Sequence, residues 1–179
     1  RNLGIKISKA HYIAFLDSDD YWAKNKLSNQ INFMRQFNYK FTYTDYTPFV
    51  LRNNKKIFKK TVSPSNSYNH SQFIYDTSIA TSSMIIKKSA IGKIKFFNTE
   101  ILEDYPFKYK ILKTRSNAHK LKKNLMFYRI SKNSLQSNKL RNIYWLWYIN
   151  KKYNKFSILK NIMSIFMISI SSIKKYGIK

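Results

Sequence analysis

Residues 12–20 read Tyr-Ile-Ala-Phe-Leu-Asp-Ser-Asp-Asp, and this stretch decides the fold. Residues 12–16 form a short, continuous apolar run, which is the pattern of a fully buried strand in an α/β sheet. The run stops at Asp17, Asp19 and Asp20, so these acids follow the carboxyl end of the strand. Open α/β sheets bind their ligands in the crevice at that end. The stretch therefore predicts an α/β domain with a ligand site at its acids.

The acids at residues 17–20 have two explanations. Asp19 or Asp20 can cap a following helix, because a carboxylate accepts hydrogen bonds from the free N–H groups of a helix start. The other explanation is a divalent cation, since Mg²⁺ and Mn²⁺ take oxygen ligands, usually one or two carboxylates completed by substrate phosphates and water. Carboxylates crowded after a buried strand repel one another unless a cation is present. That repulsion favours the metal site.

The remaining elements follow from periodicity and turn residues. A helix is expected over residues 22–37, and its apolar stripe comprises Leu27, Ile31, Met34 and Phe37, with Lys26, Gln30 and Arg35 elsewhere. A strand over 40–44 ends at Asp45, and a hairpin turns at Asn53-Asn54. Further along we expect a loop over 61–70, a short helix over 71–75, a strand over 83–87, a helix over 103–112, a strand over 125–130, and two helical segments beyond residue 137, broken near residues 153–155.

Composition excludes several classes of site. The chain of 179 residues has no cysteine, which excludes disulfide scaffolds, zinc fingers, thiol nucleophiles and iron–sulfur clusters. Its three glycines are scattered, so no glycine-rich phosphate loop can form. The chain begins at Arg1 without a Met or a signal peptide, and we expect it to be the later part of a longer protein.

Basic residues dominate the charge, because 34 Lys and Arg against eight Asp and Glu give a formal net charge of +26. The lysines are spread along the chain with an excess of Asn, Ile, Tyr and Phe, so compositional drift explains much of this charge; attraction to anionic lipid or phosphate is the alternative. Acids are rare, yet a second group gathers at Glu100, Glu103 and Asp104. Such clustering indicates chemistry, although the last two also suit the first turn of a helix, where its macrodipole favours acids.

Several short motifs occur in a fixed order along the chain. They are Arg1-Asn2-Leu3-Gly4-Ile5, residues 12–22, Lys26-Leu27 with Gln30, residues 41–46, residues 81–84, Glu103-Asp104 and Tyr128-Arg129. Together they cover most of the first 135 residues, and they resemble the central signature of family 2 glycosyltransferases. The order and spacing of the first motifs are highly specific, whereas the later ones are weak alone. The chain is most similar to bacterial cell-envelope polysaccharide transferases of the teichuronic-acid type, which also end in a basic helical tail.

This resemblance implies the α/β GT-A fold, a Rossmann-like fold of nucleotide-diphospho-sugar transferases. The catalytic domain would span residues 1–135 without the first strands of the fold, and a basic helical tail would span residues 136–179. In the family the opening strands and helices hold the nucleotide base. We therefore expect an incomplete donor pocket, which puts the activity of this stretch alone in question.

The resemblance also implies roles for the acids. Asp17-Ser18-Asp19 would be the DxD motif, with Asp19 and Asp17 as metal candidates: Asp19 on the Mn²⁺ or Mg²⁺ that bridges the donor diphosphate, Asp17 near the ribose or sugar. Asp20 would support donor binding. Asp104 matches the position of the catalytic base, with Glu103 beside it, and would take the proton of the acceptor hydroxyl as that oxygen attacks the anomeric carbon. One base and one in-line displacement fit transfer with inversion.

Four further residues are substrate candidates. Arg1 aligns with a family arginine near the donor. Trp22 is a sugar contact or a packing platform, and Lys26 is a donor contact or a solvated residue of a helix. Arg129 is a phosphate contact or the partner of a carboxylate.

The tail has an apolar segment over residues 156–173, interrupted by Lys160, Asn161 and serines and shorter than the ~20 apolar residues of a membrane span. Lysines flank it, and the aromatic residues Tyr144, Trp145, Trp147 and Tyr148 precede it. This arrangement over residues 144–175 is typical of a helix lying in the interface of an anionic membrane. The alternatives are a helix packed on the catalytic domain, or on a second copy of the chain in a homodimer.

Taken with the resemblance, these features imply an inverting, metal-dependent hexosyltransferase. It would move a sugar from a nucleotide-sugar, first of all a UDP-sugar, to a hydroxyl of a cell-surface polysaccharide or a lipid-linked acceptor. We expect it to act in the cytoplasm at the inner face of a bacterial plasma membrane, without a nucleic-acid partner. Two alternatives stay open. One is a basic nucleic-acid-binding module, although no RNP or KH signature is present; the other is an inactive membrane-associated scaffold of the same fold.

Overall fold

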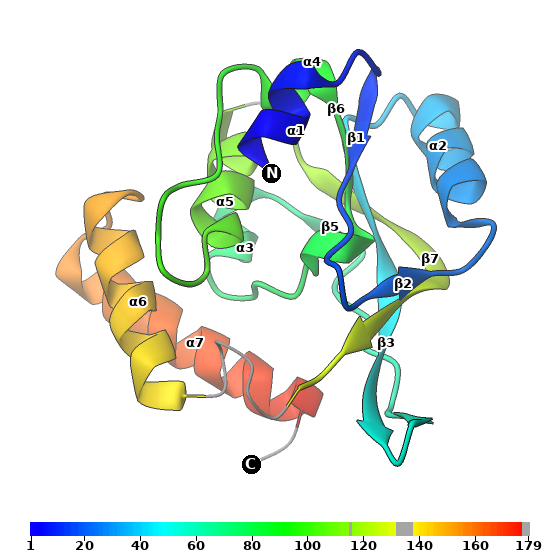
Figure 1. Cartoon of the computed structure of the whole chain (residues 1–179). Coiled ribbons are helices and arrows are strands. Elements are labelled where there is room, and N and C mark those ends of the chain that lie inside the picture. Colours follow the sequence, from blue (N-terminus) through cyan, green and yellow to red (C-terminus); the bar gives the residue numbers. More distant parts are fainter. Residues whose placement is uncertain (115, 132–137, 177–179) are drawn as a thin grey trace.

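The computed structural model describes the chain except residues 115, 132–137 and 177–179, and Figure 1 shows a single sheet with helices around it. The predicted boundary between the catalytic domain and the tail, after residue 135, lies outside the described residues. On the described part the sheet has seven strands in the order β1-β6-β3-β7-β2, with β4 on β3 and β5 on β7. Their bounds are Tyr12–Ala14 (β1), Tyr21–Trp22 (β2), Phe41–Arg52 (β3), Lys55–Phe58 (β4), Ser67–Tyr68 (β5), Ile85–Lys87 (β6) and Ala118–Arg129 (β7).

Two long strands, β3 and β7, form the centre of this sheet. They run parallel, whereas the other strand pairs are antiparallel. Their register shifts around Asp45, an irregularity that interrupts the ladder where β3 passes from the sheet centre toward the hairpin. The predicted hairpin turn is confirmed, because Asn53 and Asn54 join β3 to β4 with φ values of 47° and 58°. Asparagine tolerates this left-handed region better than most residues, which suits a tight hairpin.

Helices cover both faces of the sheet (Figure 1). One face is covered by α2 (Lys26–Gln36) and the other by α3 (His70–Phe73) and α5 (Asp104–Thr114). The shorter elements are α1 (Asn2–Ile7), the 3₁₀ turn η1 (Thr81–Ser83) and α4 (Lys88–Ile91). The last two helices, α6 (Lys139–Lys152) and α7 (Ile158–Tyr176), lie against each other beside α5, and the predicted break between them is confirmed.

The main core lies between the sheet and the helices of the α5 side. Its large, fully buried side chains include Phe41, Tyr43, Phe73, Ile86 and Phe107. Aromatic rings meet there edge to face or stacked, as with Phe96 and Phe107, whose ring centres lie 4.0 Å apart. Because this core also holds the end of β1 and the start of α5, it brings residues distant in sequence to one side of the sheet.

Two predictions about exposure are wrong. The stretch 12–16 is not a fully buried strand: β1 pairs only with β6, Ile13 and Phe15 are buried, and Leu16 is 48% exposed. The inward face of α2 is not the predicted apolar stripe either, because Lys26, Gln30 and Met34 face the sheet and Leu27 is 46% exposed.

The inward face of α2 is polar because its groups find partners on the sheet side. The Gln30 amide donates to Thr42 Oγ1 and to the Ser83 carbonyl, both at 3.1 Å. A hydrogen-bonded amide can be buried at little cost, whereas the same group without partners cannot. Periodicity identified residues that share a face, and hydrogen bonds from distant elements decided which face turns inward.

Candidate functional site

A pocket of about 450 Å³ lies beside both acid clusters. Its wall includes Asp17 and Asp20 from the turn after β1, Thr81 and Ser82 from η1, and Asp104 at the start of α5. Arg1, Glu103 and Lys108 line it too. The apolar part of the lining from the last two helices comprises Ile143, Leu146, Ile168 and Ile173. The fold thus brings Asp17 and Asp20 of the first acid cluster and Glu103 and Asp104 of the second to one cavity.

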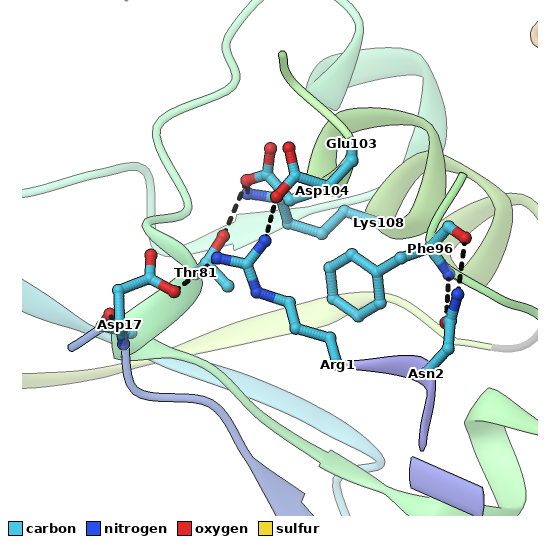
Figure 2. A network of polar contacts seen from close by, with 9 residues as sticks. Arg1, Asn2, Asp17, Thr81, Phe96, Glu103, Asp104 and Lys108 are labelled. Carbon is cyan, nitrogen blue, oxygen red and sulfur yellow. Dashed lines mark hydrogen bonds and ion pairs between the residues drawn. The ribbon is translucent and has the colours of Figure 1, made fainter. Parts of the chain in front are cut away.

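Arg1 joins the two clusters directly (Figure 2). Its guanidinium donates to the carboxylates of Asp17 and Glu103, and lies 5.4 Å from the centre of the Phe96 ring. The next residue anchors the start of the chain, since the Asn2 amide donates to the Phe96 carbonyl at 2.9 Å and accepts from the Phe96 N–H at 2.8 Å. A cation of the chain itself therefore balances two carboxylates of the pocket.

Ser82 orders the turn that carries the first acids. Its hydroxyl accepts from the Asp17 N–H at 3.0 Å and donates to Asp20 Oδ2 at 2.6 Å. The other Asp20 oxygen accepts from the Arg129 N–H at 2.9 Å. Burial raises the pKa of Asp20 to about 6, although these hydrogen bonds act in the opposite direction. Asp20 thus ties the turn to η1 and to the end of β7.

Asp104 is held as an ionised carboxylate at the start of α5. Burial is the largest single influence and opposes its ionisation, but the Lys108 ammonium, 2.5 Å away and one helical turn later, acts with the Thr81 hydrogen bond and the charge of Arg1 to hold the pKa of Asp104 below its ordinary value. Thr81 Oγ1 donates to the same carboxylate at 2.7 Å (Figure 2). Lys108 is itself fixed, because it also donates to the Ile79 carbonyl at 2.6 Å. The side chain of Asp104 keeps 21% exposure, so it is accessible from the pocket.

Four predicted site residues do not line the pocket: Asp19, Trp22, Lys26 and Arg129. Asp19 lies exposed at the tip of the turn after β1. The capping alternative for the acids is wrong, because α2 begins later, after Asn25.

The partly buried Trp22 ring and the fully buried Lys26 side chain contact each other. The Trp22 indole N–H donates to the Ser82 carbonyl at 2.7 Å, which fits the packing interpretation of this residue. The Lys26 ammonium lies 4.3 Å from the centre of the Trp22 ring and, among the described residues, has no hydrogen-bond partner. The side chain is fully buried, so its interpretation as a solvated helix residue is wrong. Burial lowers the pKa of Lys26 to about 7.

Arg129 contacts the acid turn through its backbone rather than its side chain. Its N–H donates to Asp20 at the end of β7, where Arg129 pairs with Phe49 of β3. One of the two interpretations of Arg129 was that it pairs with a carboxylate. In the structure it does contact the Asp20 carboxylate, but through its backbone N–H.

Asp17 and Asp19 can hold a divalent cation only if a bound phosphate group and water supply the other oxygen ligands. Within the described ranges, no group of three or more acidic, histidine or cysteine side chains converges as a metal site would require. Asp17 is engaged with Arg1, and Asp19 is exposed. Hard cations such as Mg²⁺ take one or two carboxylates and complete their shell with phosphate and water oxygens. The oxygen donors Asp17 and Asp19 fit such a shared site.

No role was predicted from the sequence for Thr81, Ser82 or Lys108. The first two lie in the stretch 81–84, which carried part of the resemblance without a stated function. Lys108 follows Asp104 by four residues within a predicted helix, and this spacing alone places the two side chains on one face. The hydroxyl contacts had no comparable local signal, because η1 is far from both acid clusters in sequence.

Comparisons with known proteins identify the family of the chain. The model of the family described as Glycosyl transferase family 2 matches residues 1–161. TuaG of Bacillus subtilis, named as a glycosyltransferase of teichuronic acid biosynthesis, is 25% identical over 98% of this chain and 69% of its own length. The Escherichia coli protein WfaP is 33% identical over 80% of this chain and 55% of its own length; its name describes a UDP-Glc:alpha-D-GlcNAc-diphosphoundecaprenol beta-1,3-glucosyltransferase.

Solved structures agree on the fold. S. aureus TarS, residues 1–349 in complex with UDP, matches 100% of this chain and 51% of its own, with a TM-score of 0.60 and 15% identity. The match confirms the predicted α/β fold of the GT-A type. The chain belongs to glycosyl transferase family 2. It spans about half of the TarS chain and between 55% and 69% of the lengths of WfaP and TuaG.

Proposed function

We propose that this protein transfers a sugar from a nucleotide-sugar, a UDP-sugar in the first instance, to a hydroxyl of a lipid-linked or polysaccharide acceptor, with inversion at the anomeric carbon. The observation that carries this proposal is the single pocket that contains Asp17 of the DxD sequence and Asp104. A donor site and a base in one cavity are what an in-line displacement needs. Family membership supports the class of reaction, and the printed activity of WfaP supports the class of acceptor.

Asp104 is the base in this proposal. Its lowered pKa keeps the carboxylate ionised at neutral pH, and Thr81 and Lys108 fix its position. As the acceptor oxygen attacks the anomeric carbon, its proton passes to Asp104 and the bond from that carbon to the diphosphate oxygen breaks. The nucleoside diphosphate leaves with the bonding electron pair. One displacement on one face of the sugar gives inversion.

The donor diphosphate lies toward Asp17 and Asp19. These two residues would hold a divalent cation, Mn²⁺ or Mg²⁺, which when bound neutralises the charge of the leaving diphosphate. Arg1 lies in the same region, where its guanidinium offsets part of the charge of Asp17 and Glu103 and so reduces their repulsion of the anionic donor. Asp20 supports the donor indirectly through the turn that it anchors.

The reaction would take place at the inner face of a bacterial plasma membrane, where lipid-linked acceptors are reached from the cytoplasm. No helix among the described residues is long and apolar enough to cross a membrane.

The test is sugar transfer by the protein in its full natural length, with the isosteric variant Asp104→Asn. Loss of a general base lowers the rate by about 10²–10⁴-fold. We expect this loss with UDP affinity unchanged, because Asp104 acts on the acceptor. Glu100→Gln is the matched control, since Glu100 is 63% exposed, pairs with Arg141 and does not line the pocket. Transfer at the normal rate by Asp104→Asn would refute the assignment of the base, and absence of transfer from any donor by the natural protein would favour an inactive scaffold.

A further inference from the structure

Helix α7 is amphipathic in the opposite sense to most surface helices, because its polar residues face inward. Ser164 is fully buried and donates to the Ile74 carbonyl at 2.6 Å. Asn161 is also fully buried and accepts from the Asn150 amide of α6 at 2.9 Å. Nearer the end of the helix, Ser171 donates to Asp76 at 2.9 Å. These hydrogen bonds, together with the burial of Ile168 in the core, hold α7 on the domain.

Most of the apolar residues of α7 face outward. The exposed members are Ile158 (59%), Leu159 (70%), Ile162 (52%), Met163 (48%), Phe166 (63%), Met167 (43%) and Ile173 (46%). The neighbouring helix α6 adds Leu140 (79%), Ile143 (42%), Tyr144 (62%) and Trp147 (38%). We call these eleven residues the outer face. A soluble surface rarely carries so many large apolar side chains together, and such patches mark interaction or membrane sites.

Charge indicates what covers the outer face. Lys151 continues the helical spacing of Tyr144 and Trp147 on α6, and Lys174 continues that of Met163 and Met167 on α7, and both lysines are exposed. No acid follows Asp104 in the sequence, so neither helix contributes a negative charge. A second copy placed on this face would bring lysines against lysines without acids of α6 or α7 to pair them. An anionic lipid surface offers both hydrocarbon and opposite charge.

We propose that the outer face of α6 and α7 lies in the interface of an anionic membrane, parallel to its plane, with the lysines at the headgroups. This inference rests on the proposed function and deepens it, because it assigns the path by which a lipid-linked acceptor reaches the pocket. Ile143 and Ile173 belong to the outer face and also line the pocket. Leu146 and Ile168 continue this apolar wall inward. The lipid part of an acceptor thus enters between α6 and α7, while its sugar reaches toward Asp104.

The arrangement also explains why the inward face of α7 is polar. If the inward face were apolar as well, either face of the helix could pack against the domain or against lipid. Buried hydrogen bonds to Asn150, Ile74 and Asp76 define one orientation, since a polar group left without its partner is costly to bury. The outer face is thereby kept outward.

The experiment is co-sedimentation of the chain with vesicles of phosphatidylcholine alone, or of phosphatidylcholine mixed with phosphatidylglycerol. We expect binding to the mixed vesicles and much weaker binding to phosphatidylcholine alone. Leu159→Gln/Phe166→Gln should weaken binding to mixed vesicles more than tenfold, because two large side chains lose their lipid contact. The matched control, Leu3→Gln/Ile57→Gln, changes residues that are equally apolar and 69% and 45% exposed but lie on α1 and β4. It should bind normally.

Charge is tested separately with Lys151→Gln/Lys174→Gln. Each lysine near an anionic surface strengthens binding by a little over fivefold, so the loss of both should weaken binding to mixed vesicles roughly thirtyfold. Lys59→Gln/Lys60→Gln removes the same charge from exposed positions after β4 and should have a small effect. Equal losses in both charge variants would overturn the assignment of the face, because they would reflect net charge alone.

The other occupants are outcomes of the same experiment. A dimer in light scattering that Leu159→Gln/Phe166→Gln converts to a monomer, with no vesicle binding, would overturn the proposal in favour of a second copy. Vesicle binding needs neither donor nor metal, so it fails independently of the proposed enzyme activity. If vesicles bind as expected but Asp104→Asn does not affect transfer, the surface stands and the catalytic assignment fails.

Discussion

Replacing Lys108 by Met should change the ionisation of Asp104 more than any other single substitution. In the structure the Lys108 ammonium lies 2.5 Å from Asp104 Oδ2, and its side chain is 4% exposed. Methionine keeps the apolar volume of the lysine stem but removes the charge. Thr81 then remains as the donor to a carboxylate whose ionisation burial opposes. The pKa of Asp104 should therefore rise.

The cost of the substitution follows from the contact. Removing one partner of a buried ion pair destabilises a protein by about 3–5 kcal/mol, because the other charge stays buried without compensation. In the natural protein the lowered pKa means that Asp104 stabilises the fold above its unfolded pKa, and that this stabilisation is lost as pH falls through the folded pKa. In Lys108→Met the pairing is gone, so the variant should be less stable at neutral pH and its Asp104 should take up a proton at higher pH.

The assay is a pH titration of the side-chain carboxyl carbons by NMR. With eight Asp and Glu in the chain the spectrum is sparse enough to follow each group. Lys110→Met is the matched control, because Lys110 lies on the same helix but over the Phe97 ring, away from Asp104. Lys108→Arg should restore most of the shift. An unchanged Asp104 titration in Lys108→Met would refute the reasoning that this ion pair keeps the base ionised.

Two further predictions concern buried polar groups. Because burial lowers the folded pKa of Lys26 to about 7, below its unfolded value, stability should rise with pH between about 7 and 10.4. Lys26→Met should remove that dependence and stabilise the chain by about 2–4 kcal/mol at pH 7, a gain that shrinks toward pH 10 in chemical denaturation; a constant difference across this range would contradict it. Asn150→Leu should cost about 2–4 kcal/mol, because Tyr105, Asn161 and Asn154 lose their buried partner; an unchanged unfolding midpoint would show that the contacts do not hold α7.

Much of the fold could be predicted from local sequence. The strand near residue 12, the hairpin at Asn53-Asn54 and the two final helices were recognised from apolar runs, turn residues and periodicity. The α/β fold of the GT-A type was correct as well. These features depend on near neighbours in the chain, which is why composition and spacing suffice to find them.

The errors arose where distant residues decide the outcome. Leu27 was expected to be buried and is exposed, whereas Lys26 was expected on a different face and is fully buried. The reason is that Gln30, on the same face as Lys26, finds hydrogen-bond partners on β3 and in η1. A pattern of polar and apolar residues does not contain the positions of those partners.

In the site, too, local features could be predicted from the sequence, whereas contacts between distant residues could not. Asp17 and Asp104 were both singled out in sequence, and the structure brings them to one pocket. The ion pairs of Arg1 with both clusters were not predicted, because they join residues that only the tertiary fold brings together. The spacing of four residues between Asp104 and Lys108 would have predicted their ion pair, but this prediction was not made. Roles that no contact tests, such as metal binding by Asp19, stay predictions.

The central claim is a donor site built on Asp17 and Asp19, and calorimetric titration of UDP tests it most directly. The protein in its full natural length would be titrated with Mn²⁺ present and after its removal, and Asp19→Asn would be compared with it. We predict binding that requires both the metal and Asp19, with Asp104→Asn binding UDP normally. Binding of equal affinity without Mn²⁺ or in Asp19→Asn would contradict the account, as would a failure of UDP and every other nucleoside diphosphate to bind.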